Sequence, residues 1–191
     1  MTFNWLDITT TALGLAYIIL EWRASWVMWI VGIAMQLLGI ALYYQKGLYA
    51  DCGMEFYYLA ISVYGLMLWT KHLSKTQKPV PRPITHIPAR MIAYWTLALA
   101  AMWGAIYCIL AFLTDSTVPV ADSFTTALSI VGIWALARKY VEQWLIWIAV
   151  DAVTCVLYFY KDIPFKASLY GLYVVIAIAG YLRWRRLAVA Q

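Results

Sequence analysis

Residues 24–45 read ASWVMWIVGIAMQLLGIALYYQ and contain no Asp, Glu, Lys or Arg. A helix that crosses the hydrocarbon core of a bilayer needs about 20 predominantly apolar residues, and this stretch supplies them. Residues 91–114 form a second stretch without charge. We therefore expect both segments to be membrane-spanning helices.

The rest of the chain has the same character, since 65% of its residues are hydrophobic and only 12% are charged. A soluble domain of this size needs more polar surface. Five further apolar stretches are shorter or carry a single acidic residue. They centre on residues 5–20, 56–70, 123–137, 144–160 and 167–182. The sequence thus predicts an all-α integral membrane protein with seven transmembrane helices.

The basic residues indicate an orientation, because short cytoplasmic loops collect Lys and Arg. Of the fourteen Lys and Arg residues, all except Lys46, Lys161 and Lys166 fall on one side of the predicted spans. We expect the N-terminus outside and the C-terminus in the cytoplasm. Because the positive charge is spread over alternate loops, we do not expect nucleic acid as a partner.

An internal repeat with a displacement of 115 residues runs through the chain. Residues 10–13 (TTAL) recur at 125–128, and further matches follow in the same order. These matches are Tyr43 with Tyr158, Tyr58 with Tyr173, Gly65 with Gly180, and Trp69 with Trp184. The pattern Trp26-x-x-Trp29 recurs as Trp144-x-x-Trp147 at a displacement of 118, which predicts a local insertion of three residues.

Each copy of the repeat holds three predicted helices, so a fourth helix must return the chain across the bilayer before the second copy begins. This predicts a 3+1+3 parallel repeat. We divide the chain into a first three-helix repeat (1–73), a cytoplasmic linker with connecting helix four (74–122) and a second three-helix repeat (123–191). In repeat-built transporters the substrate lies where the halves meet.

Two polar residues occupy equivalent mid-span positions. Gln36 lies seven residues from Trp29 and from Tyr43, and Asp151 has the same spacing from Trp144 and Tyr158. A heptad step returns to nearly the same helix face. A charged Asp at a helix centre costs about 2.5 to 3.5 kcal/mol, so it should face a partner or a wet cavity. Asp151 either contacts a ligand or only hydrogen-bonds a neighbouring helix, and Gln36 either contacts a ligand or joins two helices.

Further candidate ligand contacts lie on the third predicted helix and among the aromatic residues. Glu55, with Tyr58 on the same helix, is deeper than Asp51, which we interpret as an interfacial residue. Most Trp and Tyr side chains are expected in interfacial belts, but the repeated tryptophan pairs would face the proposed centre. An aromatic box with carboxylates suits a flat cation. The predicted substrate-binding residues are Trp29, Gln36, Glu55, Tyr58, Trp144, Trp147, Asp151, Tyr158 and Tyr173.

Enzymatic chemistry has little support in the sequence. HExxH, GxSxG and GxxxxGK[ST] motifs are missing, and both histidines, His72 and His86, fall in the predicted linker. The three cysteines have no CxxC spacing. We expect no enzyme activity, no metal and no cofactor.

Several motifs resemble those of the PnuC vitamin transporters. Residues 144–151 (WLIWIAVD), 158–161 (YFYK) and 169–171 (LYG) resemble the second-half signature of that family. Residues 46–51 (KGLYAD) and 64–69 (YGLMLW) look like its other recurrent stretches. The resemblance covers nearly the whole chain.

This resemblance implies a fold similar to the SWEET sugar transporters, a homo-trimer in a bacterial inner membrane, and facilitated diffusion of an unphosphorylated vitamin. A cytoplasmic vitamin kinase would then trap the substrate by phosphorylation. Many members have Gln where Glu55 stands, and residues 49–58 look most like the short thiamine-type members. We therefore predict thiamine as substrate, with nicotinamide riboside as the alternative.

Two other hypotheses stay open. A proton-coupled symporter would use Asp151 as its coupling site, because a buried carboxyl group can titrate near neutrality. A membrane scaffold without transport activity would use its aromatic side chains only to pack the helix bundle.

Overall fold

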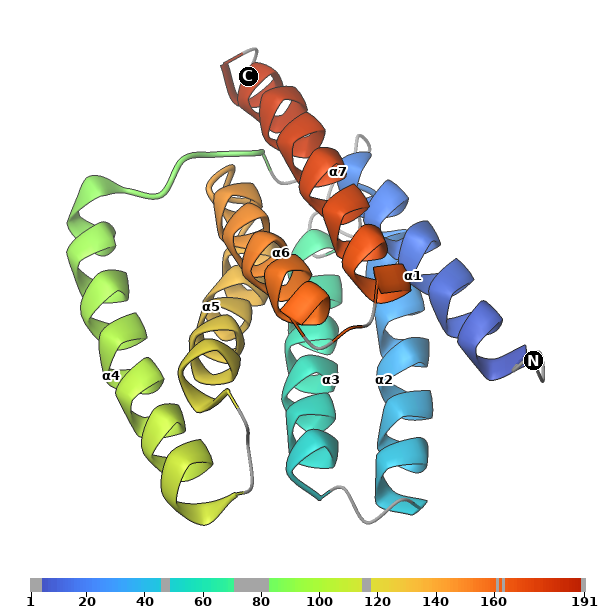
Figure 1. Cartoon of the computed structure of the whole chain (residues 1–191). Coiled ribbons are helices and arrows are strands. Elements are labelled where there is room, and N and C mark those ends of the chain that lie inside the picture. Colours follow the sequence, from blue (N-terminus) through green and yellow to red (C-terminus); the bar gives the residue numbers. More distant parts are fainter. Residues whose placement is uncertain are drawn as a thin grey trace. The chain divides into compact units, whose positions relative to one another are not determined.

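The computed structural model describes residues 5–45, 49–70, 83–114, 118–160, 162 and 164–189, with side chains except those of 5–11, 49–51 and 165. Within these ranges the chain forms seven α-helices (Figure 1). They are α1 (Trp5–Trp22), α2 (Val27–Gln45), α3 (Tyr49–Thr70), α4 (Ala89–Leu113), α5 (Pro119–Ala137), α6 (Gln143–Tyr160) and α7 (Pro164–Val189). Each helix covers one of the seven predicted spans. The side chains of Lys46, Asp51 and Lys161 and the linker residues 74–82 lie outside the described residues.

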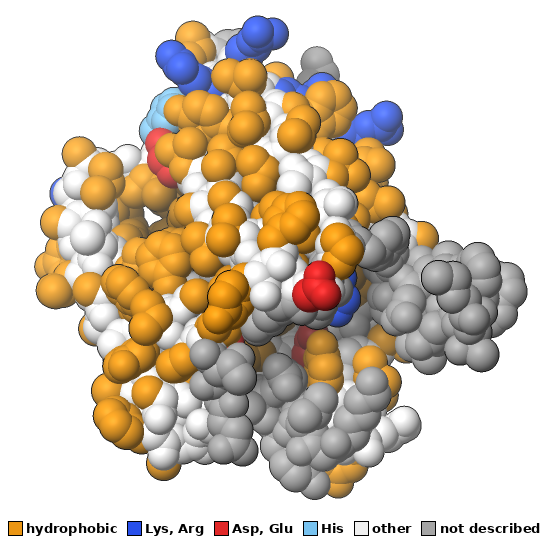
Figure 2. All heavy atoms as spheres, in the orientation of Figure 1, with side chains coloured by type: hydrophobic (Ala, Val, Ile, Leu, Met, Phe, Trp, Pro, Cys, Tyr) orange, Lys and Arg blue, Asp and Glu red, His pale blue; other side chains and the backbone are white. Residues whose placement is uncertain are grey.

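Length and composition make most of these helices suitable for crossing a bilayer. Among the described residues, five segments qualify: α2, α4, α5, α6 and the Lys166–Val189 part of α7. Within α1, residues Ala12–Trp22 form a shorter apolar helix. Figure 2 shows hydrophobic side chains over most of the visible surface, with Lys and Arg gathered beside the C-terminal end of α7. The chain is an all-α integral membrane protein.

The helices group into two compact units. Unit one spans Met1–Arg82 and contains α1 to α3, and unit two spans Pro83–Gln191 and contains α4 to α7. In unit one, α2 packs against both α1 and α3. In unit two, α6 packs against α5 and α7 in the same way, and α4 adds to the outer side of α5. The division at residues 73/74 and 122/123 and the 3+1+3 parallel arrangement stay predictions.

Helices α1 and α5 end in the same backbone motif. In unit one, Ala24 has a φ of 53°, its N–H donates to the Glu21 carbonyl (2.8 Å), and Ser25 N–H donates to the Leu20 carbonyl (2.9 Å). These bonds form a Schellman motif. In unit two, Lys139 has a φ of 59° and the corresponding bonds run from Lys139 to Leu136 (2.8 Å) and from Tyr140 to Ala135 (3.0 Å). Each residue of the second motif lies 115 positions after its counterpart in the first.

In each of two helix triplets, α1–α3 and α5–α7, a tryptophan of the second helix packs on a glycine of the third. We call this contact the tryptophan clamp. In unit one, Trp29 of α2 is fully buried, and a Cβ atom on Gly65 of α3 would lie 2.5 Å from its ring. Trp69 then packs edge-on against the same indole, with ring centroids 5.6 Å apart and planes at 88°. Only glycine allows this approach, because the indole occupies the volume of a side chain.

The second unit contains the same clamp at the same displacement. Trp144 of α6 is fully buried, a Cβ atom on Gly180 of α7 would lie 2.6 Å from it, and Trp184 packs edge-on at 5.7 Å and 86°. Trp29 therefore corresponds to Trp144. The predicted insertion of three residues is wrong, because turn geometry and packing both keep a displacement of 115.

The segment before α4 pairs with the α5–α6 turn at one end of unit two (Figure 1). Thr85 N–H donates to the Lys139 carbonyl (3.1 Å), and its carbonyl accepts from Val141 N–H (3.0 Å). The Glu142 carboxylate contacts His86 Nδ1 at 2.7 Å and accepts from Ile87 N–H at 3.0 Å. We call residues 83–88 the strap. It ties α4 to α5 and α6 through backbone and carboxylate hydrogen bonds.

Candidate functional site

In unit one, the predicted polar residues lie on the facing sides of α2 and α3. Glu55 of α3 is half-buried and rests on Gly39 of α2, where an added Cβ atom would lie 2.7 Å from the Glu55 Cδ and 2.9 Å from its Oε1. Gln36, also half-buried, precedes Gly39 by one helical turn. Tyr58 follows Glu55 by three residues, and its ring packs edge-on against Tyr57 at 5.7 Å. A carboxylate, an amide and phenol groups are therefore available in this unit.

In unit two, an acidic residue and a group of tyrosines lie on α6 and α7. Asp151 of α6 is only 7% exposed, and it interacts electrostatically with Tyr173 of α7. The Tyr170 ring lies 5.6 Å from the Tyr173 ring and 5.4 Å from the Tyr158 ring. The ammonium of Lys166 lies 5.5 Å from the Tyr158 ring centroid. The Tyr158 and Lys166 geometry is that of a cation–π contact, so this cluster already holds one cation on an aromatic face.

Trp147 differs from the other predicted tryptophans. It is half-buried, and its ring rests on Gly132 of α5, where a Cβ atom would lie 3.4 Å from the indole. Its indole Nε1 is buried and has no hydrogen-bond partner among the described residues, which also holds for the fully buried Trp29 and Trp144. Because an unmade hydrogen bond of a buried donor is costly, this N–H is a candidate donor to a ligand.

The structure places Trp29 and Trp144 in the packed interior of their own units. Each is held by a glycine and a second tryptophan of the next helix, as described above. Trp26, which the sequence pairs with Trp29, is 43% exposed. In this structure the two clamped indoles pack helices, and the four tryptophans do not share one environment.

Two polar residues that the sequence did not single out stand close to the functional candidates. Tyr170 joins Tyr158 and Tyr173, and its position is the repeat counterpart of Glu55. Gln143, at the start of α6, is fully buried, and neither amide atom has a hydrogen-bond partner among the described residues. The displacement of 115 already pairs Tyr170 with Glu55 in the sequence, although Tyr170 is not among the predicted substrate-binding residues. The burial of Gln143 has no signal in the sequence.

Two of the three cysteines contact a neighbouring helix, whereas Cys108 on α4 is exposed. Cys52 Sγ on α3 lies 3.8 Å from the Ile40 carbonyl oxygen, and Cys155 Sγ on α6 lies 3.1 Å from the Ala167 carbonyl oxygen. The two contacts lie at the same repeat positions, because Cys52 corresponds to Ala167 and Ile40 to Cys155. The thiol is on the third helix of the triplet in unit one and on the second helix in unit two. Among the residues that the structure describes, no three His, Cys, Asp or Glu side chains gather in a way that could hold a metal ion.

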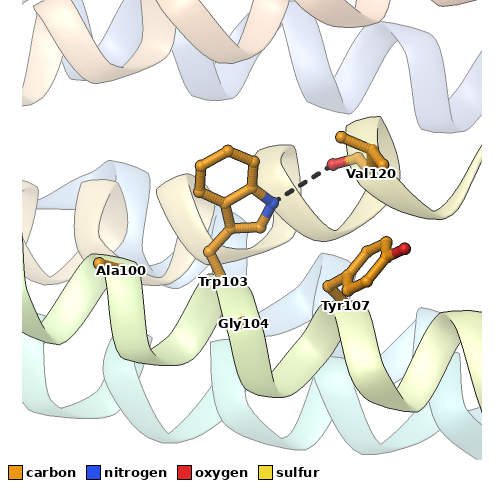
Figure 3. Close-up of a pocket in the computed structure, with 5 residues that line it drawn as sticks. All are labelled: Ala100, Trp103, Gly104, Tyr107 and Val120. Carbon is orange, nitrogen blue, oxygen red and sulfur yellow. Dashed lines mark hydrogen bonds between the residues drawn. The ribbon is translucent and has the colours of Figure 1, made fainter.

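A cavity of about 300 Å³ opens between α4 and the start of α5 (Figure 3). It is lined by Ala100, Trp103, Gly104 and Tyr107 of α4 and by Val120 of α5. The Trp103 indole N–H points at α5, where it donates to Ser123 Oγ (3.1 Å) and approaches the Val120 carbonyl (3.4 Å). None of the predicted site residues lines it, and its walls offer little beyond apolar contact.

Comparisons with known proteins agree on one family over nearly the whole length. A family model described as nicotinamide mononucleotide transporter matches residues 4–186. The nicotinamide riboside transporter PnuC of Escherichia coli K12 is 24% identical over 206 residues, covering 95% of this chain and 85% of its own length. The riboflavin/roseoflavin transporter RibM of Streptomyces davaonensis is 26% identical, covering 94% and 84%.

A solved structure has the same fold. The crystal structure of the vitamin B3 transporter PnuC matches with a TM-score of 0.75 and 22% identity, covering 97% of this chain and 83% of that one. A further nicotinamide riboside transporter PnuC, from Neisseria mucosa, is 22% identical over 193 residues, covering 96% and 73%.

Proposed function

The chain belongs to the nicotinamide mononucleotide transporter family, and we propose that it carries a flat, positively charged vitamin across a bilayer, with nicotinamide riboside as the first candidate. The observation that carries the proposal is the pairing of acidic with aromatic side chains in the helix triplets. Glu55 precedes Tyr58 by about one helical turn in unit one, and Asp151 interacts electrostatically with Tyr173 in unit two.

The chemistry of these groups favours a cation over a neutral ligand. A carboxylate within a membrane span is costly unless a partner offsets its charge. A cationic ring stacked on tyrosine gains about 0.5 to 2 kcal/mol per favourable contact. Nicotinamide riboside carries a positive charge on its pyridinium ring, so it would satisfy an acidic residue and the aromatic rings together.

Thiamine is the second candidate. The Glu55 carboxylate could accept hydrogen bonds from its aminopyrimidine, while Asp151 offsets its thiazolium charge, and residues 49–58 look like thiamine-type members. The comparisons support nicotinamide riboside better, because two relatives that carry this name cover more than nine-tenths of the chain. The riboflavin/roseoflavin relative makes neutral riboflavin the informative third ligand.

Transport in this proposal is facilitated diffusion by a homo-trimer in a bacterial inner membrane. The uneven distribution of Lys and Arg supports an N-terminus outside and a C-terminus in the cytoplasm. A cytoplasmic vitamin kinase traps the substrate by phosphorylation. The competing mechanism couples uptake to protons through the buried Asp151.

Liposomes that contain the purified full chain test the proposal. We expect labelled nicotinamide riboside to enter faster than into empty vesicles and to stop at the outside concentration. An enclosed kinase with ATP should then drive accumulation. Equal rates with and without protein, for both nicotinamide riboside and thiamine, would exclude the proposal. Uptake that rises with an inward proton gradient in the wild type, but not in Asp151→Asn, would favour the symporter.

A further inference from the structure

The Glu55 carboxylate occupies space that exists only because residue 39 is a glycine. A Cβ atom at position 39 would lie 2.7 Å from the Glu55 Cδ, 2.9 Å from Oε1 and 3.1 Å from Cγ. Real Cβ contacts essentially never fall below 3.0 Å. The end of the Glu55 side chain therefore lies directly on the α2 backbone, and any side chain at position 39 would move the carboxylate.

Two other glycines of unit one show what is particular about this contact. At Gly65 the neighbour is the fully buried ring of Trp29, at 2.5 Å, whereas at Gly53 an added Cβ atom would meet nothing within 4 Å. At Gly39 the neighbour is the far end of a flexible side chain. An alanine at position 39 can thus be accommodated by rotating Glu55, without repacking the helices.

The second unit lacks this arrangement. At the repeat positions of Gly39 and Glu55 stand Thr154 and Tyr170, and the Tyr170 ring packs between Tyr158 and Tyr173. Glycine at position 39 accompanies the carboxylate at position 55, and neither stands at the corresponding positions of the other half. This pair gives unit one its acidic character at this level of the α2–α3 contact.

We propose that Gly39 is a positioning residue that fixes the Glu55 carboxylate on α2, beside the Gln36 face, and so sets the preference for cationic over neutral vitamins. This inference rests on the proposed function. Displacing a carboxylate by about 1 Å from a cation at 4 Å weakens the attraction, at an effective dielectric constant near 20, by an amount worth about fourfold in affinity. A neutral ligand would not feel this change.

The test measures the affinity of the full-length, detergent-solubilised protein for nicotinamide riboside and riboflavin, together with its melting temperature. We expect Gly39→Ala to weaken nicotinamide riboside binding about fourfold, with riboflavin binding and melting temperature unchanged. Gly53→Ala is the matched control on α3 and should change nothing. Gly65→Ala should lower the melting temperature, because its Cβ meets a rigid buried ring.

A double variant separates positioning from a general packing role. In a Glu55→Gln background, Gly39→Ala should have no further effect on nicotinamide riboside affinity, because the charge that it displaces is gone. The inference is overturned if Gly39→Ala weakens binding equally with and without the Glu55 charge, or if it lowers the melting temperature as Gly65→Ala does. Wild-type protein that binds neither nicotinamide riboside nor thiamine would instead overturn the proposed function, and this inference with it.

Discussion

The two helix triplets, α1–α3 and α5–α7, share their backbone contacts but not their chemistry. Both have the same Schellman turn and the same tryptophan clamp, at a constant displacement of 115 residues. Their polar residues differ, since Asp151 stands at the repeat position of Gln36 and Tyr170 at the repeat position of Glu55. The clamps and turns therefore repeat a scaffold, while the positions between them are free to make the two triplets chemically unlike.

The largest effect should come from emptying a clamp. We expect Trp29→Ala and Trp144→Ala each to lower the free energy of unfolding by about 3 to 5 kcal/mol, because each leaves a cavity of indole size against a glycine. Denaturant or thermal unfolding of the purified protein measures this. Trp26→Ala, at a site that is 43% exposed, is the control and should have little effect.

The same variants decide between a packing and a binding role. If Trp29→Ala lowered vitamin affinity strongly while the free energy of unfolding stayed unchanged, the indole would belong to the substrate site. The packing role that we assign to both clamps would then be wrong for unit one. Equal losses of stability in the two units would instead make the clamp a property of the repeat.

The sequence predicts the helices and the displacement of 115 correctly, because the length of an apolar stretch and the order of matching residues can both be read from residue identities alone. It misaligns the tryptophans of the two repeats. Trp26 and Trp29 match Trp144 and Trp147 by residue type, but burial and glycine contacts align Trp29 with Trp144. Residue identity in aromatic-rich spans does not reveal which ring is buried. The strap could not be foreseen either, since Thr85 pairs with backbone more than 50 residues away.

The strap is the second difference between the two halves. At the repeat position of Glu142, unit one has Val27, an exposed residue whose side chain has no carboxylate to accept such hydrogen bonds. We expect Glu142→Val to open residues 83–88, with amide hydrogen exchange at Ile87 about fivefold faster, because a hydrogen bond to a partly exposed carboxylate contributes about 1 kcal/mol. Exchange measured by mass spectrometry reports this.

Glu142→Gln is the matched variant for the strap. It keeps an oxygen that can accept from the Ile87 N–H but removes the carboxylate charge that contacts His86, so its effect should be smaller. Unchanged exchange in Glu142→Val would mean that the Thr85 backbone pairing alone holds the segment.

The smallest effect should come from exchanging the thiol contacts between the halves. Cys52→Ala installs the residue found at Ala167, and Cys155→Ile installs the residue found at Ile40. Because thiols are weak donors and Cys52→Ala removes a single heavy atom, we expect that variant to shift the free energy of unfolding by about 0.5 kcal/mol, whereas Cys155→Ile adds two heavy atoms and should cost about 1 kcal/mol. Thermal unfolding checks this. A loss comparable to that of Trp29→Ala would show that the two halves are not interchangeable here.

One reciprocal contact limits how such proteins can be recombined. Tyr17 of α1 rests on Gly32 of α2, whereas Gly132 of α5 lies beneath Trp147 of α6, and these are the same two positions of the repeat with ring and glycine exchanged. A chimera that joined α1 to α6 would bring two rings into one space, and one that joined α5 to α2 would leave that space empty. The first two helices of a triplet must therefore be inherited as a pair, which makes the hairpin, not the single helix, the unit of exchange.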